Sequence, residues 1–189
     1  MPLDITELPK NWRRCLSGPQ DEGGDSTQLK PFWCVAHVKP RCEKKLAKYC
    51  EDWKVDYILP LYKSLKTYPT KRVVFYKPYF PGYIFINTPL ENHQMLKKSQ
   101  HLARLIKVVD QELFAKQLVS VLLAITSDAE LLPASKIKPG ILVRIKRGVL
   151  RGVEGLVEER RGVCRVCLSL DFIGQGVIME VDADDLEVV

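Results

Sequence analysis

The sequence predicts an α+β fold in two parts, an antiparallel sheet flanked by helices followed by a small all-β barrel. Before about residue 126, short segments with strand-like composition or alternation are separated by segments with helical apolar spacing. Beyond residue 139 only short strand-like segments separated by glycines follow. A length of 189 residues allows one or two domains with hydrophobic cores.

The composition is that of a soluble globular protein, with 46% hydrophobic and 28% charged residues. No apolar run approaches the roughly 20 residues that span a bilayer, and the first residues lack the apolar core of a signal peptide. A cytoplasmic monomer with no membrane partner is therefore expected.

The net charge of +6 is concentrated in the middle of the chain. Residues 31–134 carry 16 Lys/Arg against 9 Asp/Glu, whereas residues 1–30 carry 4 against 5 and residues 135–189 carry 9 against 9. A local basic excess suits a polyanionic partner, and a solvated cationic surface is the alternative.

The central stretch of the sequence is residues 77–87 (KPYFPGYIFIN). Pro81-Gly82 predicts a type II turn, because glycine accepts the positive φ that this turn needs. In the strand that follows, Tyr83 and Phe85 alternate with Ile84 and an isoleucine at 86. One face therefore enters a core, and the other forms an exposed aromatic surface suited to a partner. The alternative is a strand buried on both sides.

The first predicted elements are a strand at 32–38 and a helix at 41–54. The helix has one apolar stripe, made of Cys42, Leu46, Tyr49, Cys50 and Trp53. Its other side carries a basic ridge made of Arg41, Lys44, Lys45 and Lys48. This ridge is a candidate polyanion-binding surface, with simple solvation as the alternative.

Two strands, at 55–65 and 71–77, are predicted to form an antiparallel meander with residues 83–87. A short helix at 90–100 and a strand at 102–109 come next. Asp110 is a suitable N-cap for a final amphipathic helix.

The predicted organisation has four parts: a flexible leader at 1–30, an α+β domain at 31–126, a linker at 127–138 and a barrel domain at 139–189. The barrel strands are expected at 141–145, 155–158, 163–168 and 177–181. Their β-branched residues fit a pleated sheet better than a helix.

The six cysteines are predicted to be reduced thiols that pack as small hydrophobic residues. Cys164 and Cys167 form a C-x-x-C pattern, but positions three apart in a strand face opposite sides of a sheet. No second ligand pair accompanies them, so no metal or cofactor is expected. Because no spacing predicts a catalytic group, a non-enzymatic protein is expected. A thiol enzyme using Cys164 and Cys167 remains an alternative.

PYFPGYIF at 78–85 and PGILVRIKRGVLRGVEGLVEE at 139–159 carry a resemblance to the NusG/RfaH family of transcription elongation factors. The first resembles the family's F-P-G-Y signature and the second its KOW motif, in the family's order over about 31–189. Trp33 stands where the family has a strand-starting tryptophan. The segment at 148–155 (GVLRGVEG) and Phe172-Ile173 resemble the specialised antiterminator paralogues.

The resemblance implies a transcription elongation or antitermination factor that binds the clamp helices of RNA polymerase through its N-terminal domain. The implied contacts are His37, Phe80, Tyr83 and Phe85. Aromatic anchors on a rigid sheet contribute contact area at low entropic cost.

The resemblance implies further partners for other parts of the chain. Upstream or non-template DNA would lie beside Lys39 and the basic ridge. His93 falls near a segment that RfaH-like proteins place against the opposite polymerase lobe, although Gln94 and Met95 depart from its threonines. The KOW domain would recruit a further partner, a ribosome or Rho, around Phe172 and Ile173. An RNA- or ribosome-associated KOW protein that acts without polymerase is the alternative function.

Overall fold

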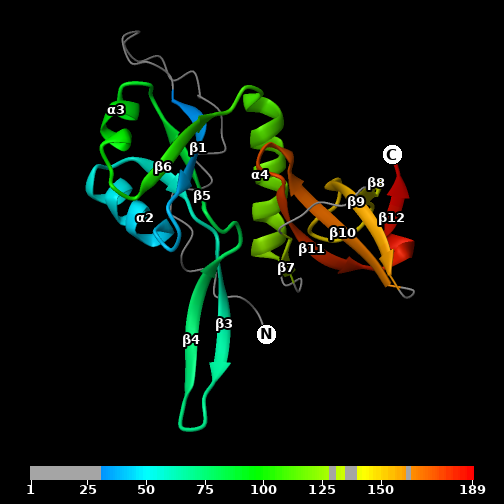
Figure 1. Ribbon diagram of the computed structural model, residues 1–189. Coiled ribbons are helices and arrows are strands. Elements are labelled where there is room, and N and C mark those ends of the chain that lie inside the picture. The colour runs from blue at the N-terminus through cyan, green and yellow to red at the C-terminus, as the bar shows by residue number, and fades with distance from the viewer. Residues whose placement is uncertain (1–30, 128–130, 135–139, 161–162) are drawn as a thin grey trace. The chain divides into compact units, whose positions relative to one another are not determined.

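The computed structural model describes residues 31–127, 131–134, 140–160 and 163–189 (Figure 1). Two compact units form, and neither is continuous in sequence. Unit A comprises residues 31–59 and 81–111, and unit B comprises residues 60–80 and the described residues from 112 onward. The expected leader lies outside the described residues. The division into domains at 31–126 and 139–189 stays a prediction.

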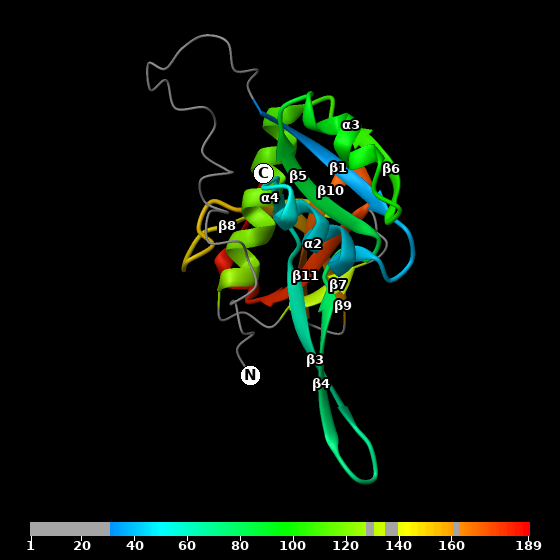
Figure 2. The same ribbon diagram turned by 90° about the vertical axis from the view of Figure 1, so that its left-hand side faces the viewer.

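Unit A is built on a four-stranded antiparallel sheet with the strand order β2-β5-β1-β6. Its elements are β1 (Phe32–Val38), α2 (Glu43–Asp52), β2 (Asp56–Ile58), β5 (Tyr83–Thr88), α3 (Asn92–Lys97) and β6 (Leu102–Lys107). Figure 2 shows α2 and α3 over the same face of this sheet. Four consecutive residues of β1, 33–36, are buried, as in a strand covered on both faces.

Unit B contains a two-stranded hairpin, a helix and a six-stranded antiparallel sheet. The hairpin consists of β3 (Leu61–Thr67) and β4 (Arg72–Pro78), and the helix is α4 (Gln111–Thr126), whose first residue belongs to unit A. The sheet order is β12-β8-β9-β10-β11-β7. Its strands are β7 (Leu131–Ala134), β8 (Ile141–Ile145), β9 (Glu154–Arg160), β10 (Val163–Leu170), β11 (Gln175–Val181) and β12 (Leu186–Val188). Short 3-10 turns occur at Asp171–Ile173 (η1) and Ala183–Asp185 (η2).

The predicted α+β class is confirmed: an antiparallel sheet with helices precedes a sheet-rich region consistent with a KOW domain. The strand-forming composition of the C-terminal region is also borne out. The predicted linker at 127–138 differs in one respect, because β7 lies within it and pairs with β11.

The prediction of a single strand at 55–65 is wrong. The chain leaves β2 at Leu59-Pro60, and β3 then pairs only with β4. Proline cannot donate a backbone hydrogen bond, so Pro60 cannot extend the ladder of the central sheet. The predicted meander is correct for its first pair of strands, because β3 and β4 pair antiparallel. It is wrong for the third strand, because β5 pairs with β1 and β2 instead of β4.

The predicted helix at 41–54 is shorter than expected at both ends. Arg41 has a φ of 60° and lies outside the helix, which begins at Glu43. Leu46 and Cys50 are buried as the apolar stripe predicts. Trp53 is 58% exposed and follows the last helical residue, so it does not belong to the buried stripe.

Candidate partner-binding site

The Pro81-Gly82 turn is fixed to two neighbouring elements of unit A. Gly82 has a φ of +86°, the positive value that the predicted turn requires. The carbonyl of Gly82 accepts a hydrogen bond from the Val38 amide at 2.9 Å. The Gly82 amide donates to Oε1 of Glu43 at 3.0 Å, in the first turn of α2. The turn therefore has a defined position at the end of β1.

His37 and Tyr83 form an aromatic pair beside this turn. They are directly opposite each other in the antiparallel pairing of β1 and β5. Their ring centroids lie 5.2 Å apart with an interplanar angle of 38°. The Gly82 Cα faces the imidazole, since a Cβ at residue 82 would lie 3.8 Å from the His37 ring. Both rings are half-buried, so each keeps a solvent-accessible part.

The expected exposed aromatic surface does not extend to Phe80 and Phe85, which are fully buried. Phe85 belongs to β5, which lies between β1 and β2 in the sheet. Its neighbours Ile84 and Ile86 are buried as well, so this part of β5 is covered on both faces. The alternative of a two-sided buried strand is correct for residues 84–86. The accessible aromatic groups in unit A near the turn are His37 and Tyr83.

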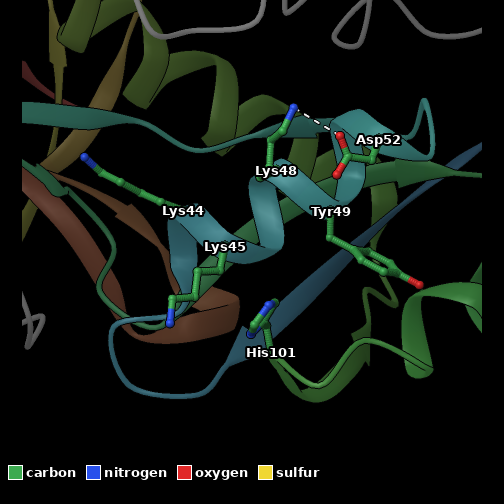
Figure 3. Close-up of a pocket in the computed structure, with 6 residues that line it drawn as sticks. All are labelled: Lys44, Lys45, Lys48, Tyr49, Asp52 and His101. Carbon is green, nitrogen blue, oxygen red and sulfur yellow. Dashed lines mark ion pairs between the residues drawn. The ribbon is translucent and has the colours of Figure 1, made fainter.

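The basic ridge borders an open hollow of about 400 Å³ in unit A (Figure 3). Its lining residues are Lys44, Lys45, Lys48, Tyr49, Asp52 and His101. Figure 3 shows the ends of Lys44 and Lys45 pointing in different directions from α2. The Lys48 ammonium lies 3.0 Å from Asp52 and 3.4 Å from Glu51. The hydrogen bond and charge of Asp52 raise the pKa of Lys48. Part of the ridge charge is therefore neutralised.

Lys39 and Arg41 are exposed but lie before α2 rather than on it. The Lys39 amide donates to the His101 carbonyl at 3.0 Å, which connects the end of β1 to the segment before β6. The left-handed φ of Arg41 separates it from the helical spacing on which the ridge was predicted. Of the five predicted DNA-proximal cations, Lys44, Lys45 and Lys48 thus form the helical group.

His93 lies in α3, and its ring packs against Phe32 with a centroid distance of 5.1 Å. Its Nε2 is buried and has no hydrogen-bond partner in the described part of the chain. Burial lowers the pKa of His93, and the charge of Lys97 lowers it further. The side chain is half-buried, so only its accessible part could make the second polymerase contact implied by the resemblance.

The predicted KOW surface residues lie in η1. Phe172 is exposed and Ile173 is half-buried. Within unit B the Phe172 ring meets Phe114 of α4 edge-on, with centroids 6.2 Å apart. The Gln117 side chain donates to Oδ2 of Asp171 at 2.7 Å and accepts from the Asp171 amide at 3.2 Å. Phe172 therefore already has an aromatic neighbour in this structure.

Sequence reasoning missed two features. Glu43 fixes the turn, and its signal is a carboxylate in the first turn of the helix. The β3–β4 hairpin carries five cations and no acidic residue between residues 61 and 78. Its signal is the local charge count, which the total for residues 31–134 does not reveal. Within the described ranges, no group of three His, Cys, Asp or Glu side chains could hold a metal ion, and no helix is long and apolar enough to cross a membrane.

Comparison with known proteins places this site in a recognised domain. Residues 31–121 match the family model described as transcription termination factor nusG. The chain therefore contains a NusG family domain, which includes β1, α2 and β5. Comparison with curated proteins gives no match.

Among solved structures, the chain is similar to the NusG of Thermotoga maritima, in a structure titled "Domain interaction in Thermotoga maritima NusG". The identity is 16%, the match covers 85% of this chain and 98% of that one, and the TM-score is 0.50. This similarity shows a common fold.

Proposed function

We propose that this protein is a non-enzymatic transcription elongation or antitermination factor that acts in the cytoplasm and binds RNA polymerase through unit A. The NusG family match carries the proposal, because its residues contain the whole site around the Pro81-Gly82 turn. His37 and Tyr83 are the proposed direct contacts to the clamp helices. A paired, partly accessible aromatic surface on a rigid sheet is the kind of anchor that dominates protein interfaces.

Phe80 and Phe85 have a different role in this proposal. Both are fully buried, so neither is a direct contact to the partner in this proposal. Phe85 follows Tyr83 by two residues and is paired with Val35, two positions along the ladder from the His37–Tyr83 pair. A change at Phe85 would therefore affect binding through the position of β5.

The basic hollow is the proposed DNA-proximal surface, with Lys44, Lys45 and Lys48 as its cations. Lys48 contributes less because Asp52 lies 3.0 Å from its ammonium group. Lys39 and Arg41 would add charge from the preceding segment. Sequence-independent attraction of this kind falls with rising salt.

His93 as a second polymerase contact and Phe172 and Ile173 as the KOW partner surface remain parts of the proposal. The specialised antiterminator role, and the choice between a ribosome and Rho as further partner, rest on the sequence resemblance alone.

Affinity purification from the native host tests the proposed function. We expect RNA polymerase to co-purify with the intact chain, and a Tyr83→Ala variant to lose it while still unfolding cooperatively in a thermal melt. Co-purification of ribosomes without polymerase would favour the RNA- or ribosome-associated alternative and contradict the proposal.

A further inference from the structure

The β3–β4 hairpin combines a high positive charge with accessible aromatic groups. Residues 61–78 carry five basic side chains and no Asp or Glu. The cations are Lys63, Lys66, Lys71, Arg72 and Lys77. None of them takes part in the ion pairs of the described residues. In contrast to Lys48 on α2, these cations have no carboxylate partner in the described part of the chain.

The hairpin is a regular ribbon with a tight end. Seven residue pairs join its strands, from Leu61 opposite Pro78 to Thr67 opposite Arg72. Tyr68 and Lys71 exchange two backbone hydrogen bonds, of 2.8 and 3.3 Å, around a two-residue turn. Figures 1 and 2 both show this long ribbon. Its side-chain positions are therefore set by strand geometry.

One face of the ribbon places an aromatic ring between two cations. Phe75 lies opposite Ser64, and the neighbouring pairs on the same face are Tyr62 with Lys77 and Lys66 with Val73. Phe75 is 39% exposed, and Tyr68 at the turn is 44% exposed. Tyr62 packs against the buried Tyr79 instead, with ring centroids 5.1 Å apart. Phe75 and Tyr68 thus remain accessible beside the charges.

We propose that the β3–β4 hairpin is a binding site for single-stranded nucleic acid, in which Lys66, Lys71 and Lys77 contact phosphates and Phe75 and Tyr68 stack on bases. These five residues share one face of the ribbon, whereas Lys63 and Arg72 lie on the other face. This site is separate from the basic hollow on α2, and the proposal does not rest on polymerase binding. Cations attract any polyanion, including duplex DNA and acidic polypeptides. Accessible rings favour a single strand, because its unpaired bases expose faces on which an aromatic side chain can stack.

The test measures fluorescence anisotropy of the intact chain with labelled 15-nucleotide oligothymidylate, oligouridylate and a 15-base-pair duplex. Each cation that neutralises a phosphate contributes about −0.7 to the slope of log affinity against log salt on a single strand. Three contacts give a slope of about −2.1, or about 18-fold weaker binding when salt rises fourfold. Binding of either single strand above the duplex is expected, and the two probes distinguish DNA from RNA.

Two pairs of variants separate the hairpin from general charge effects. K66Q/K77Q should reduce the slope to about −0.7, whereas K97Q/K98Q removes the same charge from α3 and its vicinity and should leave the slope unchanged. F75L should weaken single-strand binding about 5-fold or more through lost stacking, while F75Y should retain it.

Three results would overturn the proposal. These are an equal loss in both lysine variants, an F75L variant that binds as tightly as the original chain, and polyglutamate or duplex binding equal to that of the single strands. Circular dichroism of each variant checks that the fold is unchanged, so that a loss of affinity reports on binding.

Discussion

Replacement of the two aromatic residues of β5 distinguishes a core position from a contact position. Phe85 is fully buried, so Phe85→Ala removes a ring from the packed interior of unit A and leaves a cavity. Such a change costs about 3–5 kcal/mol of unfolding free energy. Tyr83 is half-buried and pairs with His37 at 5.2 Å. Losing an aromatic pair of this kind costs about 0.5–1.5 kcal/mol.

The effects on polymerase binding should have the opposite order. If Tyr83 anchors the interface, Tyr83→Ala should weaken binding by about 2 kcal/mol or more, roughly 30-fold in the dissociation constant. Tyr83→Phe is the matched control, because it keeps the ring and removes only the hydroxyl. Urea unfolding of each intact variant gives the stability change, and titration of immobilised polymerase gives the affinity.

Two outcomes would refute this reasoning. Phe85→Ala could retain full stability and lose polymerase binding, which would make Phe85 a direct contact. Tyr83→Ala could instead be as unstable as Phe85→Ala, which would make Tyr83 a core residue.

Three further predictions concern the turn, His93 and the thiols. Gly82→Ala should destabilise the chain by about 1–2 kcal/mol because φ at residue 82 is +86°, whereas Gly82→Asn should cost less; equal melting temperatures would contradict this. Burial lowers the pKa of His93, so the unfolded chain binds a proton that the folded chain does not, and stability should fall as pH drops below about 6.5. His93→Gln should make the pH dependence of urea unfolding shallower over that range, and an unchanged slope would be inconsistent with a neutral buried imidazole. Burial raises the pKa of Cys34 and of Cys50 to about 12, so both thiols should resist alkylation at pH 8. Cys164 and Cys167 are only half-buried and should react. Mass spectrometry of the alkylated native chain shows which thiols are modified.

The sequence predicted features that depend on short-range pattern. The strand at 32–38 and the strands after residue 139 were found because composition and alternation act over a few neighbouring residues. The glycine turn was found because its backbone angle needs a particular residue type. The break at Pro60 is not evident from the pattern, because apolar residues continue on both sides of the proline.

The burial of Phe85 could not be read from β5 alone. Period-2 alternation separates the two faces of a strand, but the covering of each face depends on segments distant in sequence. The pairing of β5 between β1 and β2 decides this, and only the tertiary structure provides it. In the same way, spacing predicted Lys48 as part of a basic ridge but not the strength of its pairing with Asp52.

The backbone contact between Pro60 and Tyr79, where the hairpin begins and ends, affects which changes in hairpin length the fold can accept. The Tyr79 amide donates to the Pro60 carbonyl at 2.9 Å, so this hydrogen bond holds the two ends of the β3–β4 hairpin together. Between them the strands form a simple ladder closed by a two-residue turn. Cross-strand pairs could therefore be added or deleted two at a time, preserving which side chain faces which side, without altering the register of the central sheet. The whole hairpin could therefore be exchanged between related proteins, and its length and charge could evolve independently of the central sheet.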